Sequence, residues 1–240
     1  MNDALFPYLL FWTVGLLFFA IELIRPARTL QYRSVFLRDL VALGIYDVFF
    51  LVGMNITDRI PIPNYASSIM DMPLPVLLIL FYVVEDFGLY WVHRVMHTKS
   101  VWRVHKWHHS PKYMYWLAGY RTTIPHIIFF NLAYVVALPI VHQVPPWVIV
   151  AIGAEHLLRN NWMHMNVAWK SSWLEWVVVT PRYHHIHHSD DPQHYTSNFG
   201  SLFTVWDRIF GTYLNPEEVK KEISFGIGER QNPVRLILGV

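Results

Sequence analysis

Residues 73–109 read PLPVLLILFYVVEDFGLYWVHRVMHTKSVWRVHKWHH, an apolar run that passes directly into five histidines. The run over 73–92 is long enough to cross roughly 30 Å of hydrocarbon at ~1.5 Å per residue. The histidines lie at spacings i, i+4 and i, i+3, i+4, which place their side chains on one face of a helix. They are His93 and His97, then His105, His108 and His109. The stretch therefore predicts a membrane helix that carries candidate metal ligands at one end.

Four further apolar runs accompany this one. The chain has 240 residues, of which 54% are hydrophobic and 15% charged, outside the usual range of soluble globular proteins. The runs cover 5–24, 37–56, 124–141 and 144–158. The first run lacks the charge pattern and cleavage site of a signal peptide and favours an anchor helix. We expect an all-α membrane protein with four to five transmembrane or re-entrant helices.

The last two runs form either two spans or a re-entrant pair. The segment His142-Gln143-Val144-Pro145-Pro146 joins them and is typical of a tight turn, because proline cannot continue a helix but can begin one. The run over 144–158 is short and carries Glu155 and His156. Both arrangements leave the histidines on the same side.

Positive charge predicts the orientation, because Lys and Arg are retained on the cytoplasmic side of membranes. Four arginines, at positions 25, 28, 33 and 38, lie between the first two runs. If this loop is cytoplasmic, every histidine cluster is cytoplasmic, and Arg59 is the one outside cation of the 19 Lys and Arg. We expect a multi-pass protein with N-terminal transmembrane helices over 1–72 and a cytoplasmic tail over 216–240.

The abundance of histidine needs an explanation. The chain has 14 histidines and no cysteine, so disulfides and thiolate metal sites are excluded. A third cluster reads His184-His185-Ile186-His187-His188, in which the first, fourth and fifth residues share a helix face and His185 points about 100° away. Polar residues within apolar runs are costly and usually face a site, which makes His164 a candidate ninth ligand.

Other polar residues near the histidines have two readings each. His156 is a candidate ligand or a hydrogen-bonded core residue, and Asn160 is a weak oxygen ligand or a group that orients a ligand. Asp86 lies seven residues before His93, so it could accept a hydrogen bond from that imidazole or pair with an arginine. Glu85 and Glu155 could serve a proton relay or structural pairing.

Eight or nine imidazoles exceed one coordination sphere and imply two metal ions. Imidazole suits Fe, Zn, Cu and Ni, so the ligand type leaves the metal open. The HExxH pattern of zinc proteases is absent, and a redox pair beside a bilayer fits attack on C–H bonds. A membrane zinc-dependent hydrolase or metal transporter and a b-type haem electron-transfer protein are the alternatives. Net charge is +2 without a dense basic run, so nothing predicts nucleic-acid binding.

The ensemble of motifs resembles the sterol desaturase and fatty acid hydroxylase superfamily. The three clusters are similar to its histidine boxes, and the matching phrases are Trp162-Met163-His164-Met165-Asn166, Asn198-Phe199-Gly200 and Trp206-Asp207-Arg208-Ile209-Phe210-Gly211-Thr212. The resemblance covers roughly residues 80–215. It implies about four transmembrane helices, a catalytic domain over 73–215 with a cytoplasmic helical cap, and a di-iron centre with two Fe ions. Some members place a second histidine where Asn160 stands, four residues before His164, which leaves His156 as a replacement.

The resemblance also implies the reaction. Such enzymes hydroxylate or desaturate a sterol, fatty acyl, sphingoid or alkylglycerol lipid with O2, and the seven-residue gap between the first two boxes resembles the sterol desaturase and alkylglycerol monooxygenase branches. The chain has no dinucleotide fingerprint, so we expect an external electron donor, a reductase with a cytochrome or ferredoxin. Basic residues at 94, 99, 103 and 106 could steer that donor or anchor the topology. The aromatic segment 113–117 could line a lipid channel or form an interfacial belt.

Overall fold

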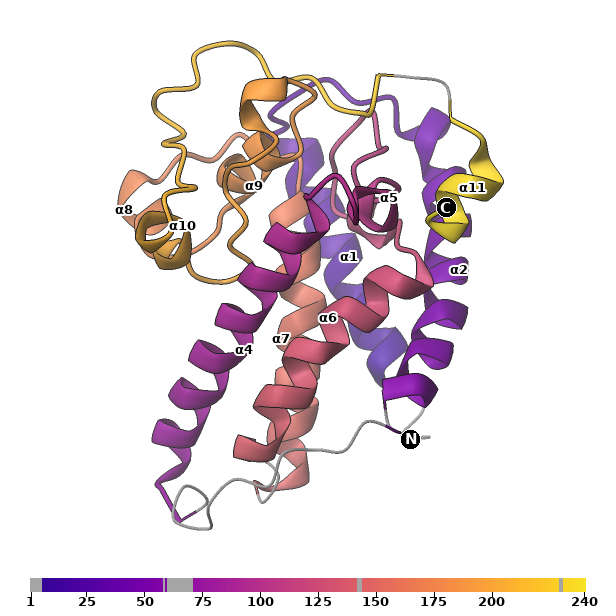
Figure 1. The fold of residues 1–240 in the computed structure, drawn as a ribbon. Coiled ribbons are helices and arrows are strands. Elements are labelled where there is room, and N and C mark those ends of the chain that lie inside the picture. Colours follow the sequence, from indigo (N-terminus) through magenta and orange to yellow (C-terminus); the bar gives the residue numbers. More distant parts are fainter. Residues whose placement is uncertain (1–5, 58, 60–70, 142–143, 229–230) are drawn as a thin grey trace.

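Five long helices form a bundle in the described part of the chain, and short helices gather at one end of it (Figure 1). The structure, a computed structural model, describes residues 6–57, 59, 71–141, 144–228 and 231–240. The long helices are α1 (Phe6–Ile24), α2 (Tyr32–Thr57), α4 (Leu74–Met96), α6 (Ile124–Ala137), which the 3-10 turn η2 (Leu138–Val141) extends, and α7 (Pro146–His164). No strand occurs among these residues, in agreement with the predicted helical fold class.

The short elements and their connecting loops form what we call the cap. They are α5 (Trp102–His105), η1 (Ala118–Tyr120), α8 (Ser172–Glu175), α9 (Pro181–His187), η3 (Pro192–His194), α10 (Val205–Ile209) and α11 (Pro233–Leu238). α1, α4 and α7 run toward the cap, and α2 and α6 run away from it (Figure 1). The connections over 25–31 and 97–123 and the whole chain after His164 therefore lie at one end of the molecule, as the charge pattern predicts.

Proline and threonine set the beginnings of the helices that carry the site. α4, α6, α7 and α9 each have proline in their first turn, where its missing N–H leaves no hydrogen bond unmade. Thr123 precedes α6 and Thr180 precedes α9, and each side chain accepts a hydrogen bond from a backbone N–H of the first turn. The last apolar run of the sequence ends at residue 158, whereas α7 continues to His164. Arg159 can lie inside the bundle because its charge is paired with Glu85. His142 and Gln143 of the predicted turn lie outside the described residues.

Most of the aromatic segment 113–117 lies in the core, and Tyr113 is its exposed residue. Tyr115, Trp116 and Leu117 are buried and pack with residues of α1 and α2. The Trp116 ring lies so close to α1 that a Cβ added at Gly15 would be 2.5 Å from it. Tyr115 donates a hydrogen bond of 2.7 Å to Asp39 of α2. The belt interpretation is therefore wrong for these buried rings, whose role is to join α1 and α2 to the cap.

One side of α4 is apolar and exposed along the whole helix. Val76, Ile79, Val83, Phe87 and Trp91 are exposed at spacings of three and four residues. The opposite side packs against α6. Among the described residues, the helices Leu74–Met96 and Ile124–Val141 are long and apolar enough to cross a membrane, and α1 holds a shorter apolar segment.

Candidate metal centre

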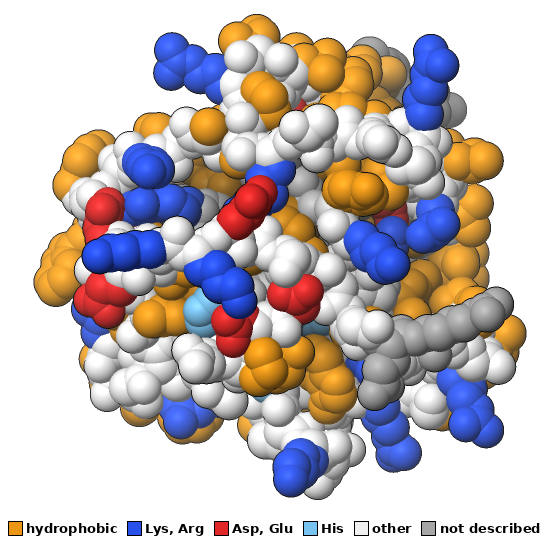
Figure 2. All heavy atoms as spheres, turned by 90° about the horizontal axis from the view of Figure 1, so that it is seen from above, with side chains coloured by type: hydrophobic (Ala, Val, Ile, Leu, Met, Phe, Trp, Pro, Cys, Tyr) orange, Lys and Arg blue, Asp and Glu red, His pale blue; other side chains and the backbone are white. Residues whose placement is uncertain are grey.

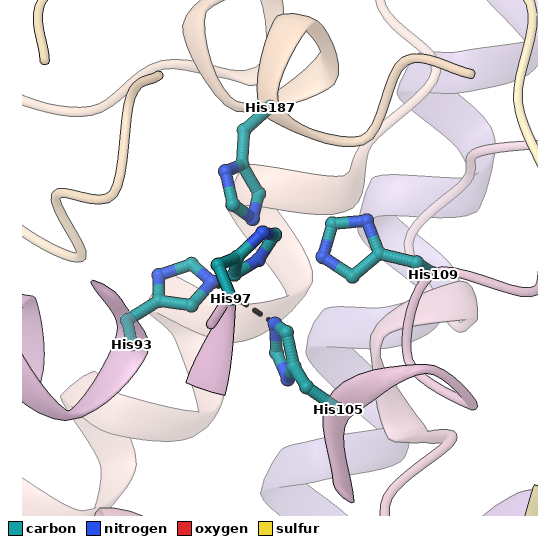
Figure 3. A group of neighbouring side chains, drawn as sticks. All are labelled: His93, His97, His105, His109 and His187. Atoms are coloured by element: carbon teal, nitrogen blue, oxygen red, sulfur yellow. Dashed lines mark hydrogen bonds between the residues drawn. The ribbon is translucent and has the colours of Figure 1, made fainter. Parts of the chain in front are cut away.

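Five histidines converge on one point where α4 meets the cap (Figure 3). One nitrogen atom of each ring lies within 4.8 Å of the corresponding nitrogen of every other ring. This first group consists of His93 on α4, His97 at its end, His105 on α5, His109 in the following turn and His187 on α9. Nitrogens bound to one metal ion are separated by up to about 4.2 Å, since each lies about 2.1 Å from it. The group therefore fits one ion after small side-chain shifts.

Three rings of the first group are oriented by alternate carbonyls of a single loop segment. The Nδ1 atom of His97 lies 3.0 Å from the carbonyl oxygen of Tyr195, and the Nδ1 atoms of His187 and His93 lie 2.9 Å from those of Ser197 and Phe199. A carbonyl oxygen can only accept, so Nδ1 carries the proton in each ring. The lone pair of each Nε2 is thereby left to face the centre of the group.

The shape of this loop depends on Asn198 and Gly200. Asn198 has a left-handed backbone with φ of 57°, which asparagine adopts more readily than most residues. Its side chain bonds both the N–H and the carbonyl oxygen of Leu214, at 2.8 and 3.1 Å. A Cβ at Gly200 would lie 2.6 Å from the carbonyl oxygen of Phe203. The phrase Asn198-Phe199-Gly200 thus allows carbonyls on both sides of Asn198 to reach histidines.

Two buried carboxylates hold the same loop from opposite sides. Asp207 of α10 accepts hydrogen bonds of 2.8 Å from the N–H groups of Phe199 and Gly200. Asp86 of α4 accepts from the N–H groups of Leu202 and Phe203 at 2.7 and 2.8 Å. Asp86 therefore does not accept a hydrogen bond from His93, and the alternative, pairing with an arginine, is met by Arg159, whose Nη1 lies 3.9 Å from Asp86. The carbonyl of Phe199 accepts the hydrogen bond from His93, and Asp86 fixes the loop that supplies it.

A second group of four histidines lies beside the first. His108, His164, His184 and His188 are all buried, and one nitrogen of each lies within 4.8 Å of the others. The Nδ1 atom of His164 lies 2.7 Å from the backbone carbonyl oxygen of Asn160. Asn160, four residues before His164, thus contacts that ring through its backbone carbonyl and not through the side-chain amide that the sequence singled out.

The two groups share their supporting elements. His108 and His109 are consecutive in the chain, as are His187 and His188, and each pair sends one ring to each group. The rings of His109 and His188 stack across the boundary with centroids 4.3 Å apart. The structure therefore brings eight histidines of the three predicted clusters, all except His185, together with His164 into two neighbouring sites.

The electrostatics of both groups suit a cation. Burial lowers the pKa of His108, His109 and His187 well below the usual imidazole value, and neighbouring imidazoles lower it further. The rings are therefore neutral at physiological pH, which is the form that binds metal. Within the described residues, the Nε2 atoms of His97, His109 and His187 are buried without a hydrogen-bond partner. Because buried polar atoms seldom stay unpaired, these lone pairs fit a metal ion.

The structure does not bring His156 into either group. It lies on α7 with its Nε2 3.4 Å from Glu85 and 3.5 Å from Glu155. Arg159 joins the same cluster at 2.9 Å from Glu85 and 3.2 Å from Glu155. The carboxylates therefore take part in structural pairing, the alternative to a proton relay, and we call these four residues the bundle ion network.

Two further histidines flank the centre. His126, near the start of α6, is buried with its Nδ1 3.2 Å from the Nδ1 of His105. His126 was missed in the sequence analysis because it is a lone histidine, although it lies at the beginning of an apolar run, three residues after the capping Thr123. His185 points away from both groups as predicted, with its Nδ1 3.1 Å from an Nη1 of Arg28.

Two adjacent all-histidine groups lie between a helical bundle and its cap, and each could hold a metal ion. A sequence model of the fatty acid hydroxylase family matches residues 78–212, more than half of the chain. The chain belongs to this family, within the sterol desaturase and fatty acid hydroxylase superfamily that its motifs resemble. Family membership and the two apolar helices together indicate a membrane protein.

Curated relatives are lipid hydroxylases and desaturases. Alkylglycerol monooxygenase of Xenopus tropicalis is 31% identical over 165 residues, which are 68% of this chain and 36% of that protein. Ornithine lipid hydroxylase OlsE of Rhizobium tropici is 30% identical over 60% of this chain and 44% of its own length. Delta(7)-sterol 5(6)-desaturase ERG3B of Gibberella zeae is 25% identical over 79% of this chain and 61% of its own. The chain thus spans a third to three fifths of these relatives, and no solved structure matches it.

Proposed function

We propose that this chain is an integral membrane di-iron oxygenase that hydroxylates or desaturates a C–H bond of a lipid, using O2 and electrons from an external donor. One observation carries the proposal: two neighbouring groups of five and four buried histidines present nitrogen lone pairs to two common points. A single ion cannot use nine ligands, and two adjacent sites suit chemistry that needs more than one electron.

Iron is the metal that fits both the histidine ligands and the redox reactions named for the relatives. Neutral imidazole binds iron, zinc and copper alike, so the ligands alone do not choose. The relatives are named as a monooxygenase, a hydroxylase and a desaturase, reactions that require a redox-active centre. When bound, two iron ions would supply the redox chemistry that activates dioxygen.

The protein's own residues position and shield the centre. The histidines of the first group would hold one ion and those of the second group the other. The loop 195–199 orients three ligand rings through its carbonyls, Asp207 bonds Phe199 at its end, and Asp86 bonds the backbone that follows at Leu202 and Phe203. Because all but one of the nine rings are buried, bulk water is kept from the reacting centre.

The arrangement of the helices and the two long apolar helices support a membrane placement. We propose that the bundle spans the bilayer several times and that the cap faces the cytoplasm, with residues 1–72 as membrane helices, 73–215 as the catalytic domain and 216–240 as a tail. Figure 2 views the cap end and shows charged side chains spread across it, with hydrophobic side chains gathered toward its edges. The apolar stripe on α4 would face lipid.

Lipids are the substrate class that the relatives indicate. Alkylglycerol, ornithine lipid and sterol appear in their names, and we extend to this chain only the shared class, a membrane lipid with an unactivated C–H bond. The donor would be a reductase with a cytochrome or ferredoxin, approaching the cap from the cytoplasm.

The test is incorporation of labelled oxygen. The purified protein, loaded with ferrous iron in lipid nanodiscs, is supplied with a chemical reductant, 18O2 and a total membrane lipid extract, and the lipids are compared by mass spectrometry. We expect a lipid that gains one 18O atom or loses two hydrogens, and neither change with His187→Ala. Lipid cleavage without reductant would contradict the oxygenase and favour a hydrolase.

A further inference from the structure

The edge of the cap beside α4 exposes large apolar side chains. Trp173 and Trp176 are 75% and 64% exposed and lie in or directly after α8. Val205 and Ile209 of α10 are 41% and 60% exposed, and Val177 is 50% exposed. We call these five residues the α8–α10 edge. Tryptophan is costly to expose to water but favours the boundary between lipid and water.

This edge lies alongside α4 and not above its end. The indole Nε1 of Trp206, in α10, donates a 2.9 Å hydrogen bond to Asp86. Asp86 precedes His93 by seven residues, which is about 10 Å along a helix. Figure 1 shows α8 and α10 beside the upper part of α4. The cap therefore reaches down one side of the bundle, past the level of the histidine groups.

Aromatic contacts make the edge continuous with the apolar stripe of α4. Phe87 of the stripe packs edge-on against Trp206 of α10, with ring centroids 5.1 Å apart. Trp91 packs against Phe210, directly after α10, at 4.9 Å. The exposed side of α4 is therefore joined to α10 by direct contacts between aromatic rings.

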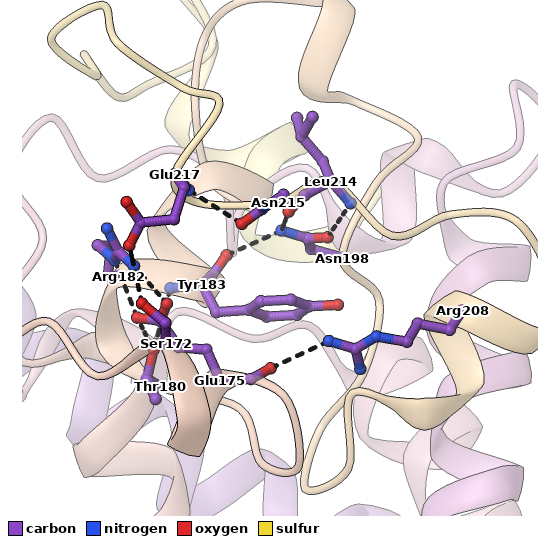
Figure 4. Close-up of polar contacts among 10 residues, drawn as sticks. All are labelled: Ser172, Glu175, Thr180, Arg182, Tyr183, Asn198, Arg208, Leu214, Asn215 and Glu217. Carbon is purple, nitrogen blue, oxygen red and sulfur yellow. Dashed lines mark hydrogen bonds and ion pairs between the residues drawn. The ribbon is translucent and has the colours of Figure 1, made fainter.

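Inward polar contacts fix the edge in this place (Figure 4). The Arg208 guanidinium lies over the rings of Trp176 and Tyr213, at 3.9 and 4.0 Å, and donates to the carbonyl oxygen of Trp176 at 2.9 Å. Buried Glu175 of α8 accepts hydrogen bonds from Arg182, at the start of α9. Glu175 is thus buried while Trp173 and Trp176 are exposed, and Glu217, which bonds Ser172 of α8 and pairs with Arg182, is an exposed charge of the same region.

We propose that the α8–α10 edge is immersed in the interfacial layer of the bilayer, so that lipid contacts the cap at the level of α4 just below the histidine groups. The depth of α10 along α4, the continuous apolar surface and the exposed tryptophans favour lipid over a protein partner as the occupant. The inference rests on the proposed membrane placement and adds where the cap meets the lipid.

The absence of cysteine makes a direct test possible. Four single-cysteine variants of the full chain, Trp173→Cys, Ile209→Cys, Ile79→Cys and Lys221→Cys, each carry a nitroxide in phosphatidylcholine nanodiscs. Relaxation by oxygen, which concentrates in lipid, is compared with relaxation by a water-soluble nickel chelate. All four side chains are exposed, so the labels do not disturb the core.

We expect positions 79, 173 and 209 to favour oxygen and position 221 to favour nickel. Nickel preference at 173 and 209 with oxygen preference at 79 would overturn the inference and leave the membrane placement standing. Nickel preference at all four positions would instead overturn the membrane placement. Protection of 173 and 209 only when a second protein is added would show a protein interface there and also overturn the inference.

Discussion

The molecule buries two polar clusters that differ in how their charges are balanced. The histidine groups hold nine neutral rings whose lone pairs converge with no opposing charge among them. The bundle ion network, centred on Glu85 and Arg159, pairs carboxylates with a guanidinium at 2.9 and 3.2 Å. Glu85 precedes His93 by eight residues, about 12 Å along α4. The first cluster lacks a cation that a metal would supply, whereas the second contains its own.

This difference explains why residue type and spacing could not decide whether His156 is a metal ligand or a core residue. The spacing of His156, Asn160 and His164 places all three on one side of α7. Only His164 meets other lone pairs, because α9 approaches that end of α7, while His156 faces Glu85 of α4. The role of a histidine on α7 thus depends on which side chain of the neighbouring helix it contacts, another imidazole or a carboxylate.

The largest expected difference is in metal content, between a variant of a histidine in the first group and a variant of the histidine in the bundle ion network. His187→Ala removes a ring of the first group, and we expect it to abolish turnover and lower the metal content measured by mass spectrometry. His156→Ala should keep the metal content of the wild type because it removes no converging lone pair. Equal metal loss in both variants would contradict the distinction.

Breaking the bundle ion network should affect stability more than metal binding. Arg159→Met leaves Glu85 buried without its cation, and we expect a loss of about 3–5 kcal/mol in the free energy of unfolding. The double variant Glu85→Gln with Arg159→Met should recover part of that loss, since the fully buried residue 85 then carries no unpaired charge, although Glu155 still lacks its cation. Thermal unfolding in detergent measures both, and an Arg159→Met variant as stable as the wild type would remove the network's structural role.

The loop that orients the ligands can be weakened without touching a ligand. Asp207→Asn replaces an acceptor of two backbone hydrogen bonds with a group that has one acceptor oxygen. We expect a 10–100-fold lower metal affinity, the usual effect of losing a group that orients ligands. Competition with a chelator measures the affinity, and Asp71→Asn, at an exposed position, is the matched control. Unchanged affinity would show that the loop carbonyls orient the rings without Asp207.

The smallest effect is expected at His126. His126→Phe removes the partner of His105 Nδ1 while keeping the site filled. We expect metal affinity to fall by about tenfold or less, because His105 keeps its place but loses one hydrogen bond. Complete loss of metal from the first group, read from the same chelator competition, would make His126 a ligand and not a positioning residue.

The helices and most of the site follow from local patterns in the sequence. Apolar runs predicted the five long helices, because 20 apolar residues suffice to define a span. The i, i+3, i+4 spacing predicted which rings of each cluster face together, including the outward turn of His185. Both inferences depend only on the geometry of one helix.

Contacts between distant segments could not be predicted in the same way. The carbonyls of Tyr195, Ser197 and Phe199 meet histidines about 100 or 10 residues away, and main-chain atoms carry no residue-specific signal in a sequence. Asp86 was singled out for its spacing to His93, but its partners lie in the loop after Gly200. Backbone partners of this kind depend on the tertiary fold.

The central claim is that the two histidine groups hold two iron ions. The direct measurement is metal analysis with Mössbauer spectroscopy on detergent-purified protein from cells grown in iron-57. We predict about two irons per chain, the number that the two groups require, with a nitrogen-rich, magnetically coupled signature. One zinc per chain, or haem iron, would contradict the claim.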